Sequence, residues 1–465
     1  MRFTSFVFLF WFLPLVLLLY VGLPTLLHRF FRPRWRAALL QNGILLSSGL
    51  LFYAWGEPLY VLLLLGTVLF DYCAGRAIAQ SKRPRPLLWG AVSLHVMLLL
   101  YFKYAALLIP SPPRMPLGLS FYTFLGISYV ADVYSSRIRC EESLLSFGTY
   151  MTLFPLLTAG PIARYETVAG PLRQRAATAA DAAAGARRFL AGLAKKVLLA
   201  NPAGGLFHTF AAFPKGELTV TGALLALFGF FFQIYYDFSG YSDMAIGLGR
   251  MFGLPLPENF NYPYTAIGFR DFWRRWHITL SAFFRDYVYI PLGGSRRGVF
   301  RTVLALFAVW SLTGLWHGAT LNFLLWGLYY FLLIVAERWL PQRLKTAFPR
   351  PVCRVITILG VLLGWLIFAF DSSADYLTLS ALGSFLKGLL GQNGVAAGAD
   401  LYDLLRHLPF FAVAAIGATP LPRRLYHRAA ARFPALSLLL PAAALLLSVA
   451  YLADASFLPF LYARF

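Results

Sequence analysis

Apolar runs of bilayer length constrain this chain more than any other feature of its sequence. Residues 6–27 and 435–453 are predominantly apolar over about 20 positions, the length that a helix needs to cross the hydrocarbon core of a membrane. Of the 465 residues, 59% are hydrophobic and only 13% are charged, which is about half the charged share of ordinary soluble domains. The sequence therefore predicts an all-α, polytopic transmembrane protein.

Individual spans are predicted from apolar length, and loops from clusters of charge, proline or glycine. The predicted spans are 5–27, 38–55, 58–74, 87–109, 117–134, 147–160, 187–212, 219–237, 301–335, 355–370, 406–421 and 434–453.

The net charge of +22 is concentrated in short segments between the apolar runs. The basic segments are 28–36, 81–86, 338–354 and 423–432. Such loops follow the positive-inside pattern, with anionic lipid head groups as a secondary partner. We find no basic and aromatic motif of a nucleic-acid reader, so membrane lipids are predicted as partners and nucleic acid is not.

Residues 237–298 interrupt the pattern of spans. This segment holds five of the 19 acidic residues, is rich in aromatic residues and contains no clean apolar run. An irregular backbone in lipid would leave polar groups unpaired, so the segment must be buried in protein or line a watery cavity. The sequence therefore predicts a polar, enclosed centre.

Within this segment, residues 269–287 are predicted to form one amphipathic helix. The apolar positions at helical spacing are Phe269, Phe272, Trp273, Trp276, Leu280, Phe283 and Tyr287, and the polar stripe is Arg270, Arg274, His277, Ser281 and Arg285. Asp271 and Arg275 are four residues apart and can form an ion pair. His277 is expected to lie among cationic neighbours, which would keep its imidazole neutral.

A second histidine, His317, falls inside the predicted span 301–335. Ionisable residues within a span are costly and are usually functional or paired. The small neighbours Gly314 and Gly318 would allow a ligand or another helix to approach the imidazole; the alternative is a core histidine hydrogen-bonded between helices. A neutral imidazole can take a proton from a hydroxyl that attacks an acyl donor. The sequence carries no nucleophile elbow and no spacing typical of a metal site, so no metal is predicted.

Several motifs together resemble the membrane-bound O-acyltransferases, and within them the bacterial alginate O-acetylases. The resemblance rests on residues 235–253, 259–264, 272–298 and 313–330, with further similarity at 154–165 and 457–465. It covers most of the chain from about residue 40 onward. It implies a bacterial inner-membrane protein with a ring of about 11 to 12 spans around a thinned polar centre, which a funnel enters from each face. It also implies a single domain over 1–465, with the catalytic core at about 148–335.

The resemblance also assigns roles to individual residues. The family's catalytic histidine, in a W-H-G motif, falls on His317, and the second histidine, in an R-R-W-H motif, falls on His277. His277 with Arg274 or Ser281 would position the donor or stabilise the oxyanion. The remaining expectations are that Asp237 and Asp243 hold a histidine tautomer or an arginine such as Arg270, or else form structural salt bridges, and that Trp316 packs beside the imidazole.

The implied function is O-acetylation of a secreted, alginate-like polysaccharide. The acetyl group would come from acetyl-CoA or another acyl thioester on the cytoplasmic side, with no bound cofactor, and a periplasmic or extracellular acetyltransferase is the expected partner. Two alternatives remain open from the sequence. One is D-alanyl transfer to teichoic acid, and the other is a non-catalytic transporter of acyl groups or lipids, which would not need His317 as a base.

Overall fold

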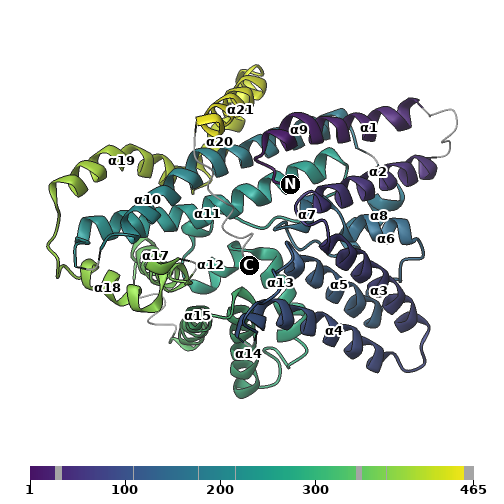
Figure 1. Cartoon of the computed structure of the whole chain (residues 1–465), viewed down its shortest axis with the longest axis horizontal. Coiled ribbons are helices and arrows are strands. Elements are labelled where there is room, and N and C mark those ends of the chain that lie inside the picture. The colour runs from purple at the N-terminus through teal and green to yellow at the C-terminus, as the bar shows by residue number, and fades with distance from the viewer. Residues whose placement is uncertain are drawn as a thin grey trace. The chain divides into compact units, whose positions relative to one another are not determined.

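The computed structural model describes residues 1–26, 34–107, 109–175, 177–214, 216–341, 348–372 and 374–454, and within these ranges it contains helices and no strand (Figure 1). The C-terminal motif at 457–465 lies outside the described residues. The helical class predicted from the sequence is therefore confirmed.

Nine helices in the described ranges are long and apolar enough to cross a membrane, or ten if one bent pair counts as a single span. The nine are η1 with α1 (Phe8–Leu26), α2 (Arg34–Ala54), α3 (Tyr60–Gln80), α4 (Pro84–Tyr104), α11 (Val220–Met251), α14 (Val299–His317), α15 (Leu321–Trp339), α17 (Arg350–Ala369) and α21 (Leu436–Asp454). The bent pair is α19 (Gly398–Gly417) with α20 (Leu421–Arg432). The chain is thus a multi-pass membrane protein.

Three predicted segments were wrong in detail. The predicted span 147–160 is two short helices, α6 (Leu144–Met151) and α7 (Phe154–Leu157), because Pro155 has no N–H to continue a helix and instead lies at the start of α7. The predicted span 301–335 is two helices, α14 and α15, which break at residues 318–320. Residues 237–251, predicted to be irregular, continue α11 to a length of 32 residues.

The described chain divides into two compact units. Unit 1 contains Met1–Leu193 and Tyr241–Glu258, and unit 2 contains Ala194–Gly240 and the described residues from Asn259 onward. α11 passes from unit 2 into unit 1 along its length.

Unit 1 contains a bundle in which α3, α4 and α5 (Leu119–Tyr134) pack against one another. Asp71 of α3 and His95 of α4 meet at its centre, with 2.7 Å between Oδ1 and Nε2 and both side chains fully buried. Gly126 of α5 covers this pair, and any Cβ there would overlap the Asp71 carboxylate. The bundle therefore encloses a polar pair that depends on a glycine.

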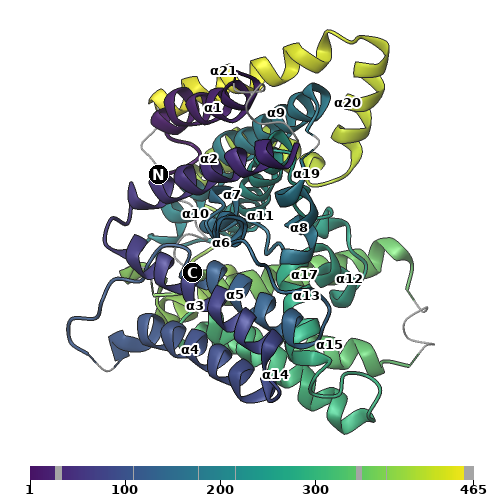
Figure 2. The same cartoon turned by 90° about the vertical axis from the view of Figure 1, so that its right-hand side faces the viewer.

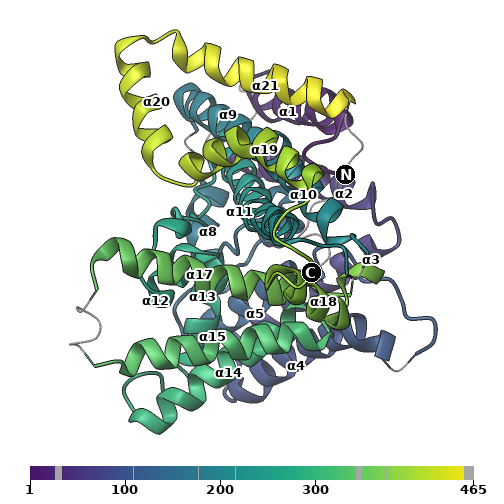
Figure 3. The same ribbon diagram turned by 90° about the vertical axis from the view of Figure 1, so that its left-hand side faces the viewer.

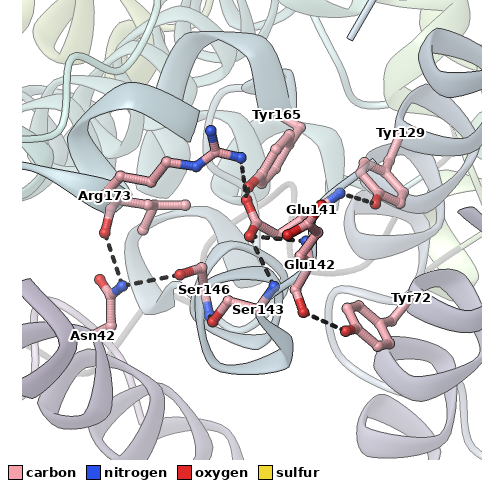
Figure 4. Close-up of polar contacts among 10 residues, drawn as sticks. Asn42, Tyr72, Tyr129, Glu141, Glu142, Ser143, Ser146, Tyr165 and Arg173 are labelled. Carbon is pink, nitrogen blue, oxygen red and sulfur yellow. Dashed lines mark hydrogen bonds and ion pairs between the residues drawn. The ribbon is translucent and has the colours of Figure 1, made fainter. Parts of the chain in front are cut away.

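A buried carboxylate, Glu141, joins the loop before α6 to the rest of unit 1 (Figure 4). It accepts hydrogen bonds from the Tyr165 hydroxyl, from the Ser143 amide at 2.9 Å and from Arg173 Nη2 at 3.0 Å. Burial acts to raise the pKa of Glu141, but these hydrogen bonds outweigh it and hold the pKa below its ordinary value of 4.5. The folded state therefore favours the charged carboxylate.

Replacing this residue, Glu141→Gln, is expected to lower the free energy of unfolding by about 1.5–3 kcal/mol, the range for hydrogen bonds to charged groups. Because the folded-state pKa is depressed, this contribution is complete above pH 4.5 and is lost as the pH falls through the lower folded-state value. Thermal melts in detergent should show the gap to wild type narrowing below that pH. Glu142→Gln, whose side chain is exposed, is the control; equal effects of both variants would contradict the prediction.

Unit 2 is organised around an antiparallel hairpin of α14 and α15, beside which α17 lies (Figure 3). A Cβ added at Gly314 would lie 2.5 Å from the carbonyl oxygen of Phe323, so the two helices approach at a distance that only glycine permits. Glu337 of α15 accepts hydrogen bonds from the first amides of α12 (Phe269–Arg275), Phe269 N at 2.5 Å and Arg270 N at 3.1 Å. These contacts cap the helix that leads to His277.

Candidate active site

His317 is the last residue of α14 and lies at the tip of the hairpin, not in the middle of a span as predicted. Its side chain is buried, and three aromatic rings from three helices surround it. The ring centroids lie 4.6 Å away for Trp316, 5.0 Å for Trp326 of α15 and 5.0 Å for Phe368 of α17. The helix ends there because the chain turns at residues 318–320 into α15.

The small residues beside His317 allow a helix to approach. A Cβ at Gly318 would lie 2.6 Å from the Phe323 ring, as tight as the contact at Gly314. Of the two expectations for these glycines, the structure shows the approach of another helix, α15.

His277 is not on an exposed helical stripe. The predicted helix 269–287 is broken into α12, α13 (Ile278–Phe284) and η5 (Arg285–Tyr289), and His277 stands at the first break. Its backbone is left-handed, with φ 43° and ψ 54°, and its side chain is buried. A non-glycine residue in this conformation persists only where surrounding contacts hold it, and such residues cluster at functional sites.

Asn259 supplies those contacts. Its carbonyl accepts a hydrogen bond from Ile278 N at 3.0 Å, and its Oδ1 accepts from Thr279 N at 3.3 Å and lies 3.0 Å from His277 Nδ1. The backbone N–H of Thr279 can only donate, so the Asn259 side-chain atom that it contacts must be the accepting oxygen. Nδ1 of His277 contacts the same oxygen and must therefore carry a proton, which it donates. The neutral ring then has its lone pair on Nε2.

Burial lowers the pKa of His277 to about 3. The imidazole is therefore neutral at physiological pH, as predicted, but for a different reason. The sequence attributed the neutral state to cationic neighbours, whereas the side chain is enclosed with Asn259 and, at 4.7 Å and perpendicular, Phe238.

Trp316 connects the two histidines. Its ring centroid lies 4.6 Å from that of His317 and 6.4 Å from that of His277. The predicted packing of Trp316 beside the imidazole is confirmed, and both catalytic candidates lie near one indole ring.

Arg274 and Ser281 are less buried than the two histidines. Arg274 is exposed, and the Ser281 hydroxyl donates a hydrogen bond to the Trp273 carbonyl at 3.3 Å, which ties α13 to α12. The break at His277 changes the direction of the chain, so positions that would share a stripe in one helix separate. The predicted Asp271–Arg275 pair is present at 2.9 Å.

The two aspartates bind cations other than Arg270. Asp237 forms a buried ion pair with Lys196 of η3 (Lys195–Ala200), with 2.5 Å between Oδ1 and Nζ. Asp243 belongs to unit 1, where Arg188 of α9 (Ala179–Ala194) contacts it at 2.9 Å and also binds Glu258. Both carboxylates thus form salt bridges, the alternative left open by the sequence.

Sequence reasoning missed three residues at this site. Asn259 holds His277, a role that was expected of an aspartate. Lys196 pairs with Asp237, a role that was expected of an arginine or a histidine. Trp326 is the third: its indole N–H, like the hydroxyl of Tyr330, is a buried donor for which the described part of the chain offers no hydrogen-bond acceptor. The motifs 259–264 and 313–330 were signals for Asn259 and Trp326, whereas nothing local marks Lys196. In the same ranges, no group of three or more His, Cys, Asp or Glu residues is placed to hold a metal ion.

Comparison with known proteins identifies the family. Residues 136–379, which include both histidines, Asn259 and Trp316, match the model of the membrane-bound O-acyltransferase family. The chain belongs to that family. It is therefore a multi-pass membrane acyltransferase, and a transporter without chemistry is not supported.

Bacterial relatives of this acyltransferase act on different polymers according to their names. It is 38% identical to the probable alginate O-acetylase of Pseudomonas aeruginosa, over 80% of this chain and 72% of the relative. It is 31% identical to the peptidoglycan O-acetyltransferase of Helicobacter pylori, over 76% and 74%. It is 27% identical to the teichoic acid D-alanyltransferase of Bacillus subtilis, over 60% and 77%.

Proposed function

We propose that this acyltransferase O-acetylates a secreted, alginate-like polysaccharide, with His317 as the general base and His277 as a positioning group. The observation that carries the proposal is the pair of buried histidines whose rings both lie near that of Trp316, at 6.4 and 4.6 Å, inside the family region. The substrate class is supported by the similarity to alginate O-acetylases, which is higher and covers more of the chain than the similarity to teichoic acid D-alanyltransferases.

In the proposed reaction, the imidazole of His317 removes a proton from an acceptor hydroxyl. The oxygen attacks the carbonyl carbon of an acetyl thioester, the new ester bond forms, and the carbon–sulfur bond breaks. The thiolate leaves and takes the proton from the imidazolium, so the base is restored. The aromatic rings around His317 favour acyl transfer over hydrolysis because they exclude water.

The tautomer of His277 limits what this residue can do. With Nδ1–H donated to Asn259, Nε2 is an acceptor and cannot stabilise an oxyanion. We propose that it accepts a hydrogen bond from the hydroxyl or from an amide of the thioester donor. The developing oxyanion needs a donor, and the buried indole N–H of Trp326, whose ring centroid lies 5.0 Å from that of His317, is the candidate that we propose.

The path of the acetyl group is part of the proposal. A cytoplasmic donor, acetyl-CoA or another acyl thioester, would enter one funnel of a helical ring with a thinned centre, and the acceptor would approach from the opposite face. Support comes from the place of His317 at the end of a span, where the chain turns, and from the long, largely buried α11. A periplasmic or extracellular acetyltransferase would receive the group and complete transfer to the polymer.

The direct test follows radiolabelled acetyl-CoA with the purified wild type in detergent. We expect thioester loss and label transfer to alginate, or to an added periplasmic acetyltransferase. Transfer of D-alanine from a carrier-protein thioester to teichoic acid, without use of acetyl-CoA, would overturn the proposed substrate.

In the same assay, Trp326→Phe keeps an aromatic ring at this position and loses the indole N–H. About 10²-fold lower kcat is expected from the loss of one oxyanion donor. Unchanged kcat would remove Trp326 from the mechanism.

Asn259→Ala removes the acceptor that fixes the His277 tautomer. We expect kcat for acetyl transfer to fall by about 10- to 100-fold, as for other residues that orient an essential imidazole. Asn261→Ala is the matched control, because that side chain is exposed and only its backbone contacts Arg275. Asn259→Asp should recover part of the activity, since a carboxylate also accepts from Nδ1–H. Equal activity of the two alanine variants would contradict the assigned role.

A further inference from the structure

We propose that α20 is an interfacial helix that binds anionic phospholipid head groups through its arginines. This inference does not rest on the proposed function. It concerns a segment outside the family region and without catalytic candidates. Three observations carry it: the direction of the helix, its charge and its two faces.

The direction of α20 is set by a sharp bend. α19 and α20 meet at 76° across a break of three residues, and α21, an apolar candidate span, follows α20 (Figure 2). α20 is therefore steeply inclined to the 20-residue α19 that precedes it and does not continue in its direction. At 12 residues, α20 is about 18 Å long, too short to span the hydrocarbon core of about 30 Å.

The charge of α20 is of one sign. It carries Arg423, Arg424, Arg428 and Arg432 and no acidic residue, and in the described part of the chain none of these arginines has a carboxylate partner. Four adjacent guanidinium groups repel one another in the absence of an anion. Phosphate esters suit them because guanidinium binds phosphate oxygens in a bidentate manner.

Side chains that follow one another by about 100° around the helix axis divide α20 into two faces. The arginines and His427 fall in one half of the circumference, whereas Leu425, Tyr426, Ala429 and Ala430 fall in the other half. No side chain of the helix is buried; Leu425 is 51% exposed, and Tyr426, Ala429 and Ala430 are partly exposed, so protein covers the apolar half only in part. This is the pattern of a helix whose apolar face enters the head-group boundary while its basic face meets the lipid phosphates.

The occupant is inferred to be an anionic lipid because both faces are then satisfied. A soluble polyanion would neutralise the arginines but leave Leu425 and Tyr426 in water. Near an anionic leaflet each arginine contributes about fivefold in affinity, which corresponds to about 1 kcal/mol.

The test uses the full-length protein in neutral detergent and counts bound lipids by native mass spectrometry, with phosphatidylglycerol and phosphatidylcholine in equal amounts. We expect wild type to prefer phosphatidylglycerol by at least tenfold. Replacement of the four arginines by glutamine should bring that preference close to parity. Replacement of the same four by lysine, the matched control, should give a preference between those of wild type and the glutamine variant, because the positive charge remains but bidentate binding is lost.

Two results would overturn the proposal. One is a glutamine variant that retains the wild-type preference for phosphatidylglycerol. The other is displacement of the lipid by alginate oligomers or free coenzyme A at stoichiometric amounts, which would make α20 a general polyanion site. Equal thermal melts of all variants in phosphatidylcholine show that the exposed substitutions leave the fold intact. Acetyl transfer is measured in parallel, so that a failure of the lipid-binding proposal is distinguished from a failure of the proposed function.

Discussion

His317→Ala is expected to lower kcat for acetyl transfer from acetyl-CoA by about 10² to 10⁴-fold, the range for loss of a general base. The ring centroid of His317 lies 5.0 Å from those of Trp326 and Phe368, so the imidazole is enclosed by aromatic side chains that cannot take its place as a base. Single-turnover measurements isolate the chemical step from product release. KM for the thioester should change little, because the proposed base acts in the transition state.

Two controls keep this result interpretable. His317→Gln preserves side-chain volume within the aromatic cluster and should lose as much activity as alanine, with a smaller change in thermal stability. His427→Ala changes an exposed histidine of α20 and should leave kcat at the wild-type value. A His317→Ala enzyme that melts normally and keeps more than about a tenth of wild-type kcat would show that His317 packs the core without acting as a base.

Most spans were predictable because the length of an apolar run reflects the thickness of the bilayer. The breaks between helices were not predictable. In residues 269–287 the apolar period of a helix is present, and Phe272, Trp276, Leu280 and Phe283 are buried as that period predicts. The interruption at His277 depends on hydrogen bonds from residues far along the chain, Ile278 N to Asn259 O and Asn261 N to Arg275 O. Side-chain periodicity carries no information about such backbone pairing.

The site residues were predictable where residue type alone restricts the role. Their hydrogen-bond and ion-pair partners were not, because these depend on the tertiary structure. A histidine inside a predicted span is costly enough to indicate function, and the W-H-G resemblance selects His317. For Asp237 the sequence left open a histidine, an arginine such as Arg270, or a structural salt bridge. The partner is Lys196, because η3 places its Nζ 2.5 Å from Oδ1. Likewise, the His277 tautomer is held by an amide, not by a carboxylate.

The buried Lys196–Asp237 pair should be strongly destabilising to break. Lys196→Met is expected to lower the free energy of unfolding by about 3–5 kcal/mol, because it leaves the Asp237 carboxylate buried without its cation. The exposed fractions of the two side chains are 7% and 1%, so water cannot compensate. Unfolding by sodium dodecyl sulfate titration in mixed micelles measures the change. Arg275→Met, which breaks the half-exposed pair with Asp271, should cost only about 0.5 kcal/mol.

The double variant Lys196→Met with Asp237→Leu decides whether the cost arises from the stranded charge or from packing. If the charge dominates, removing both partners restores most of the lost stability, since a buried ion pair replaced by apolar residues of similar volume is often neutral or stabilising. A double variant as unstable as Lys196→Met would mean that the lysine stem and aspartate are needed for shape. Recovery of stability without recovery of acetyl transfer would place the pair in the function of the site, since Asp237 directly precedes Phe238, the ring that packs on His277 at 4.7 Å.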